Sequence, residues 1–189
     1  MKRVRAAGVV LSMLVLLYSG CDKGLAPLAV TPIDPNAPTG FGGTIRFLRW
    51  PRADSIDIAI LELRLAAFKD PPIDTTGLFI EFIRGNVIIH PPIGSTNYGT
   101  HDSTGRLRDS IKYAIYFTTG LDSLPKTYSY IAMAWRYGPN SFADWRPAGL
   151  YTTHPNTFIP GAITIRKNVF IQNVDINCDF RNPPPKPWR

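Results

Sequence analysis

The sequence predicts an all-β fold, an antiparallel β-sandwich of about seven to eight strands. Short runs in which apolar and polar residues alternate recur along residues 41–180. Gly, Pro, Asn and Asp residues separate these runs, and helical periodicity is weak between them. Regular short strands without intervening helices favour a sandwich or a barrel over a layered α/β architecture.

The first two strands are predicted at 43–50 and 56–65. In the first, Ile45 and Phe47 share one face. The second places three isoleucines on one face and then changes parity for three leucines: Ile56, Ile58, Ile60, Leu61, Leu63 and Leu65. A change of parity within one run indicates a β-bulge near Ile60. Residues 61–67 also contain good helix formers, so a short helix stays an alternative to the strand that we favour.

The later strands follow the same pattern. Residues 78–83 and 86–90 are predicted to pair as a hairpin around Arg84-Gly85-Asn86. Four more strands are predicted at 109–119, 127–137, 162–166 and 173–180. Alternation places one set of side chains inside: Ile111, Tyr113, Ile115, Phe117, Ile131, Met133, Trp135, Val174, Ile176, Cys178 and Phe180. Cys178 is therefore expected to be a packed thiol without a disulfide partner.

The N-terminus has the features of a secretory signal. Lys2, Arg3 and Arg5 precede an apolar run from Ala6 to Leu17, which is shorter than the ~20 residues of a membrane-spanning helix. Small residues lie directly before Cys21. We expect residues 1–20 to be a signal peptide, 21–40 a proline-rich tether, 41–180 the β-domain and 181–189 a proline-rich, disordered tail.

Ser19-Gly20-Cys21 resembles the lipobox of bacterial lipoproteins, with Tyr18 where that family usually has Leu. The resemblance implies that Cys21 carries lipid, that a membrane is a partner, and that the domain lies in the cell envelope outside the cytoplasm. Asp22 bears on sorting between inner and outer membrane but does not decide it. The alternative is a plain signal peptide followed by an incidental cysteine.

The second half of the chain also resembles a known group of folds. Leu124-Pro125 begins a turn that leads into the 127–137 strand, and the chain ends in Val174-Asp-Ile-Asn-Cys-Asp-Phe180. This order is similar to the prealbumin-like sandwiches of carboxypeptidase-regulatory-type envelope domains. The resemblance covers about residues 42–180, and it implies a prealbumin-like or immunoglobulin-like topology and an accessory role without a reaction. Lys126-Thr127 replaces the glycine expected after Pro125.

Several function classes find no support in the residues. The net charge of +7 falls to about +4 without the signal, which is too mild to indicate nucleic-acid binding. His90, His101 and His154 stand apart, without the spacing of a zinc site. The loop around Asp102 has too few acidic residues for calcium. The nucleophile motif Gly-x-Ser-x-Gly is absent. We therefore expect no metal, no cofactor and no enzyme.

The strongest candidate binding feature is an aromatic segment at 135–151. Aromatic planes beside polar groups stack on sugar rings or clamp peptides. The candidate ligand-binding residues are Tyr137, Asn140, Phe142, Asp144, Trp145 and Arg146. In the alternative interpretation Trp135 belongs to the core, which we favour, and Trp145 closes one end of the sandwich.

These observations together predict a non-enzymatic envelope lipoprotein that acts as a binding or structural accessory domain. One alternative is a carbohydrate-binding module that uses the 135–151 segment. Another is a subunit of an envelope protein complex, which an exposed apolar patch would support. The expected partners are accordingly a membrane, a glycan or an envelope protein, and not a nucleic acid.

Overall fold

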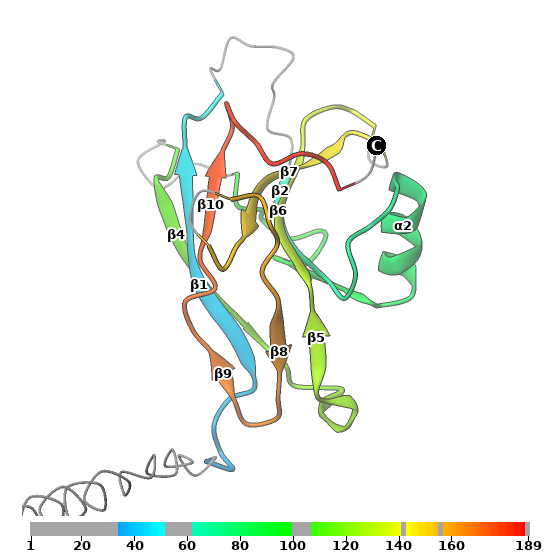
Figure 1. Cartoon of the computed structure of the whole chain (residues 1–189), viewed down its shortest axis with the longest axis vertical. Helices are drawn as coiled ribbons and strands as arrows, with labels where there is room; N and C mark the ends of the chain where they lie inside the picture. The colour runs from blue at the N-terminus through cyan, green and yellow to red at the C-terminus, as the bar shows by residue number, and fades with distance from the viewer. Residues whose placement is uncertain (1–33, 52–61, 100–106, 141–142, 155–156, 188–189) are drawn as a thin grey trace, which may run out of the picture. The chain divides into compact units, whose positions relative to one another are not determined.

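The structure is a computed structural model that describes residues 34–51, 62–99, 107–140, 143–154 and 157–187. Residues 34–189 form one compact unit. The unit is mostly β, with one short α-helix among its described residues (Figure 1). Among the described helices, none has the length and apolar character needed to cross a bilayer. The expected signal peptide, Cys21, most of the tether and the expected bulge near Ile60 lie outside the described residues.

The regular elements follow one another along the chain as a series of short strands. They are β1 (Gly40–Leu48), β2 (Glu62–Phe68), α2 (Thr75–Ile83), β3 (Val87–His90), β4 (Ser110–Tyr116), η2 (Leu121–Ser123), β5 (Lys126–Tyr128), β6 (Tyr130–Arg136), β7 (Trp145–Tyr151), β8 (Ile163–Ile165), β9 (Phe170–Ile171) and β10 (Ile176–Asp179). Seven strands are ordered β3-β2-β6-β7-β10-β1-β4 in one sheet, and β9 joins the same sheet beside β1. The strands β5 and β8 form a separate small sheet.

The large sheet is mixed, so the prediction of a purely antiparallel fold is wrong. Strand β1 runs antiparallel to β4 along one edge, but parallel to β9 and β10 along the other. Ile45 lies opposite Ile176 in the parallel ladder and opposite Ile111 in the antiparallel one. Alternation in a single strand shows which side chains share a face but not the direction of the neighbouring strand. The first and last described strands meet in the middle of the sheet, a contact that local pattern cannot reveal.

The large sheet curls as a half-barrel and is not clearly one layer of a sandwich (Figure 1). Its inner face holds the main core, and the small sheet adds Tyr128, Ile163 and Ile165 to the same cluster. The expected inward-facing side chains at Tyr113, Ile115 and along β6 and β10 are buried, which confirms the parity of those strands. The Tyr113 hydroxyl donates a 2.7 Å hydrogen bond to the Val174 carbonyl within this core.

The predicted strand at 78–83 is wrong, because these residues belong to helix α2. The Asp74 side chain accepts a hydrogen bond from the Gly77 N–H and so caps the first turn. At the other end Gly85 has a φ of +67°, and the Asn86 N–H bonds to the Glu81 carbonyl. A left-handed glycine of this kind ends helices. Residues 84–86 therefore form a turn, as predicted, but this turn ends a helix and does not join two strands.

Two further differences concern the second half of the chain. Residues 145–151 form the central strand β7, although the sequence favoured a loop-like aromatic segment there. Pro147 lies within this strand, where the β6–β7 register shifts between Met133 and Ala134. Proline is tolerated in a sheet at such an irregularity because its missing N–H removes no regular ladder bond. The tail packs against the domain over its described part, since Pro184 is buried and Lys186 lies over the Tyr137 ring.

Cys178 provides a test of the core. Its side chain is fully buried on β10, and this burial raises the pKa of the thiol. We expect a Cys21→Ser protein, whose only cysteine is Cys178, to react with a thiol reagent only when the fold opens. The rate of modification, measured by mass spectrometry with and without urea, checks this. A Ser110→Cys control at the exposed start of β4 should react at once. Prompt labelling of native Cys178 would contradict the packing of β10.

Candidate functional site

The neighbouring strands β2 and β6 have apolar side chains on both faces over residues 65–68 and 130–134. Leu63, Leu65 and Ala67 of β2 point into the main core. The alternate residues Ala66 and Phe68 belong instead to a second cluster on the outer face, together with Tyr130, Ala132 and Leu150. A strand that is apolar on both sides is typical of a sheet covered on both faces. The outer face therefore needs a cover of its own.

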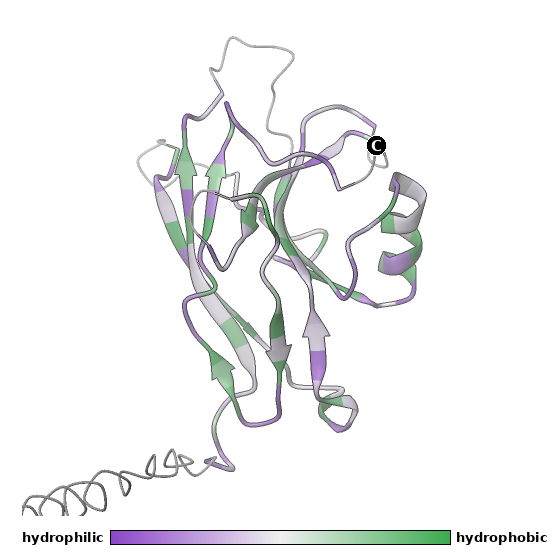
Figure 2. Cartoon of the chain, viewed as in Figure 1, coloured by the Kyte–Doolittle hydropathy of each residue, from purple (hydrophilic) through white to green (hydrophobic). Residues whose placement is uncertain are grey.

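Helix α2 supplies part of that cover. It lies beside the β2–β6 half of the sheet, away from β4 (Figure 1), and carries hydrophobic residues as the strands do (Figure 2). Leu78 packs against the second cluster, as does Val87 of β3. The outer face beneath the helix carries alanines at Ala66, Ala132 and Ala134. Because these side chains are short, they leave space between the sheet and the helix.

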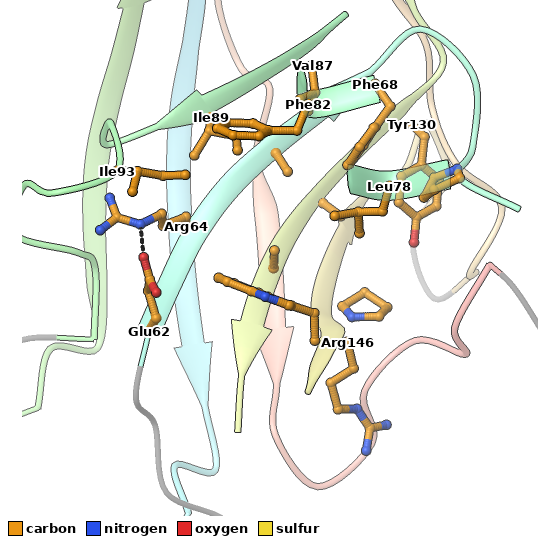
Figure 3. Close-up of a pocket in the computed structure, with 16 residues that line it drawn as sticks. Glu62, Arg64, Phe68, Leu78, Phe82, Val87, Ile89, Ile93, Tyr130 and Arg146 are labelled. Carbon is orange, nitrogen blue, oxygen red and sulfur yellow. Dashed lines mark hydrogen bonds and ion pairs between the residues drawn. The ribbon is translucent and has the colours of Figure 1, made fainter. Parts of the chain in front are cut away.

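That space is a pocket of about 320 Å³ between α2 and the outer face of the sheet. Figure 3 shows Leu78, Phe82 and Ile89 around it. Sixteen residues line it, and most are apolar: Glu62, Arg64, Ala66, Phe68, Pro72, Leu78, Phe82, Val87, Ile89, Ile93, Tyr130, Ala132, Ala134, Trp145, Arg146 and Pro147. Small-molecule sites are of this kind, with apolar walls and a few polar groups that set orientation.

One end of the pocket is charged. Arg64 is only 5% exposed, and its Nε donates to the Glu62 carboxylate. Its other nitrogens donate to the carbonyls of Pro91 and Pro92, both at 2.6 Å, and of Ser95 at 3.0 Å. The guanidinium thus ties the 91–95 loop to β2. Glu62 also accepts from the Arg136 Nε at 3.1 Å, so two cations share one carboxylate.

The other end of the pocket is aromatic and uncharged. Phe68 lies opposite Tyr130 in the β2–β6 ladder, whereas Glu62 lies opposite Arg136 at the far end of the same ladder. Burial raises the pKa of the Tyr130 phenol, so the group stays neutral. Figure 3 shows the same polarity, with the Arg64–Glu62 pair on one side of the pocket and Tyr130 on the other. Six residue steps at ~3.3 Å each separate the two ends by about 20 Å.

The border of the pocket is unusually apolar for a surface. Ile73, on the segment before α2, is 81% exposed, and Ile83 at the end of the helix is 67% exposed. Ile93, which lines the pocket, is 61% exposed, and Ile80 is 39% exposed. Single exposed apolar residues are ordinary, but a group of isoleucines beside an apolar pocket marks an interaction surface.

The sequence-predicted site residues do not form one surface. Trp145 and Arg146 both line the pocket, although the Arg146 guanidinium lies 5.7 Å from the centre of the Trp135 ring. Trp135 is buried, as we favoured, and Tyr137 packs edge-on against it. Tyr137 therefore lies with the main core and Trp145 with the pocket. A sugar platform that uses both rings has no support in this arrangement.

The polar members of the predicted set shape the β6–β7 turn. The Asp144 carboxylate accepts a 2.8 Å hydrogen bond from the Asn140 N–H, and the Asp144 N–H donates to the Asn140 carbonyl at 3.1 Å. The Asn140 side chain accepts from the Ala143 N–H. Phe142 lies outside the described residues. These bonds explain why Asn and Asp occur at these positions, because both residues stabilise turns through their side chains.

Sequence reasoning missed the pocket because its walls are spread over residues 62–147. One signal could have indicated it. The run from Leu65 to Phe68 is apolar at every position, and a doubly apolar strand requires cover on both sides. The cap at Asp74 then marks where a covering helix begins.

Comparisons with known proteins assign no family to this geometry. No family model, no curated protein and no solved structure matches the chain. The similarity to prealbumin-like domains thus stays a prediction. Within the ranges that the structure describes, no three His, Cys, Asp or Glu side chains gather as a metal site would require.

The buried arginine gives a test of the charged end. Arg64→Met keeps the unbranched apolar stem of the side chain but leaves three carbonyls without a donor. We expect a loss of about 3 kcal/mol in the free energy of unfolding, as for a buried ion pair that loses one partner. Arg84→Met removes the exposed pair with Glu81 and should cost less than about 1 kcal/mol. Urea titrations of the two variants measure the difference, and equal losses would contradict a structural role for Arg64.

Proposed function

We propose that the protein is a non-enzymatic binding domain of the cell envelope that holds an apolar group in the pocket beneath α2. In this proposal lipid on Cys21 anchors the chain to a membrane, and the domain acts outside the cytoplasm. The observation that carries the proposal is the pocket itself, about 320 Å³ in volume and walled mainly by apolar side chains. Its size is at the lower end of the range of small-ligand sites.

The lining supports binding rather than catalysis. Two of its charged groups, Arg64 and Glu62, already bond to one another, and Arg64 also donates to backbone carbonyls. Groups held in this way support a loop and leave little freedom for proton transfer. The aromatic walls, including Phe68 and Trp145, offer contact area to an apolar ligand.

A second candidate function is a subunit of an envelope protein complex. The exposed isoleucines on and around α2, above all Ile73 and Ile83, favour it. A partner protein would cover this border and exclude it from water. Cross-linking from a cysteine introduced at Ile83 in native membranes tests this candidate, because a subunit gives one discrete adduct and an isolated domain gives none.

A pocket-filling substitution tests the proposed function. Ala134→Phe fills the space beneath α2, and we expect it to weaken binding of the neutral apolar dye phenylnaphthylamine about tenfold, the loss of roughly two methylene contacts. Ala114→Phe is the matched control, since Ala114 is also a half-buried strand alanine but lies on β4. Fluorescence titration gives both affinities. Wild-type protein that does not bind the dye would refute the proposal.

A further inference from the structure

The pocket has a direction as well as a volume. Its charged end is lined by Arg64 and Glu62, with Arg136 bonded to Glu62 beside the lining, and its opposite end holds Phe68 and the neutral phenol of Tyr130. Between the ends the lining is apolar, with alanines beneath and α2 above. A ligand that matches both ends must have a polar head and an apolar body, because an uncharged hydrocarbon gains nothing at the charged end.

The charges at the polar end do not cancel. Among the described residues, the ion pairs at this end join two guanidinium groups to one carboxylate, an excess of one positive charge within the cluster. Arg64 has bonds from all three of its nitrogens, whereas the described residues provide Arg136 with bonds at Nε and, at 3.5 Å, at Nη1. The Nη2 of Arg136 has no partner among the described residues, and its side chain is 20% exposed. Arg136 can therefore donate to an arriving anion.

The volume limits the apolar part of the ligand. A methylene group is about the size of a water molecule, which takes ~30 Å³ in the liquid, so the pocket holds roughly ten such groups. The ~20 Å between its ends suits an extended chain better than a compact ring system. One chain of about ten carbons fits the volume, and with its head group it covers more than half of that length.

From these observations we propose that the ligand is a single-chain anionic amphiphile. Its hydrocarbon chain lies beneath α2 toward Phe68 and Tyr130, and its carboxylate or phosphate head accepts hydrogen bonds from Arg136. Arginine suits either head because its donors match the oxygens of both anions. The exposed isoleucines Ile83 and Ile93 would then border the path by which the chain enters. This inference rests on the proposed function and adds the chemical class of the ligand.

Amphiphiles that differ only in the head test the inference. The whole chain with Cys21→Ser, which cannot carry lipid of its own on that residue, is titrated with dodecanoate, dodecyl phosphate, dodecanol and dodecyltrimethylammonium, and displacement of phenylnaphthylamine is measured. We expect the anions to bind at least about tenfold more tightly than the alcohol, the effect of one charge-assisted hydrogen bond, and the cation to bind most weakly. The tighter of the two anions distinguishes a fatty acid from a phosphate lipid as the source.

Two substitutions are expected to change the affinity for dodecanoate in opposite directions, so misfolding of the variants cannot account for both results. Arg136→Gln should weaken dodecanoate about tenfold and leave dodecanol unchanged. Glu62→Gln removes the carboxylate that pairs with Arg64 and Arg136 and should strengthen dodecanoate. Arg84→Gln, an exposed arginine outside the pocket lining, is the matched control and should change neither affinity.

The failures of the two proposals are distinguishable. Equal affinities for dodecanoate and dodecanol, or no effect of Arg136→Gln, would overturn the anionic head while the pocket still bound apolar groups. Absence of binding by the dye and by every amphiphile would overturn the proposed function as well. A preference for the cation would reverse the assigned polarity and refute the inference.

Discussion

The double burial of β2 and β6 is the constraint on which the rest of this fold depends. Residues 63, 65 and 67 enter the main core, and residues 66 and 68 enter a second cluster on the opposite face. Each buried aliphatic or aromatic side chain contributes about 1.5–3 kcal/mol, so neither face can be left in water without a large loss. The inner face is covered by the curl of the sheet and by β5–β8. The outer face depends on α2 and on the loop that follows β3.

The pocket is a consequence of how that outer cover is built. A helix that covers a sheet faces the side chains of the sheet, and here the pocket lining includes three alanines of β2 and β6, Ala66, Ala132 and Ala134. Larger residues would give a dry contact and no cavity. The Arg64 guanidinium holds the 91–95 loop at one side of the opening, so the same residue supports the wall and sets its charge. Support of the wall and the charge at this end of the pocket thus come from one buried ion pair.

The aromatic segment at 135–151 has a different role from the one that its composition indicated. Alternation along β7 sends Trp145 and Arg146 to opposite faces, and Asp144 and Asn140 are used in the turn. The pocket receives Trp145, Arg146 and Pro147 from this segment and most of its remaining walls from α2, β2, β3 and β6. The composition of the segment indicated residues that are able to bind a ligand. In a β-strand, however, successive side chains point to opposite faces, so these residues do not all lie together.

The sequence by itself determined the β character of the chain, the parity of β4, β6 and β10, and the burial of Trp135 and Cys178. These follow from local alternation, since a strand must turn its apolar parity toward a core. The tertiary structure alone decided the parallel pairing of β1 with β10, the helix at 75–83 and the pocket. An apolar run such as Leu78–Ile83 suits a strand or a helix, and only the capped turn and the uncovered outer face of β2 and β6 select the helix. The pocket joins residues from five elements, and no local pattern contains the space between them.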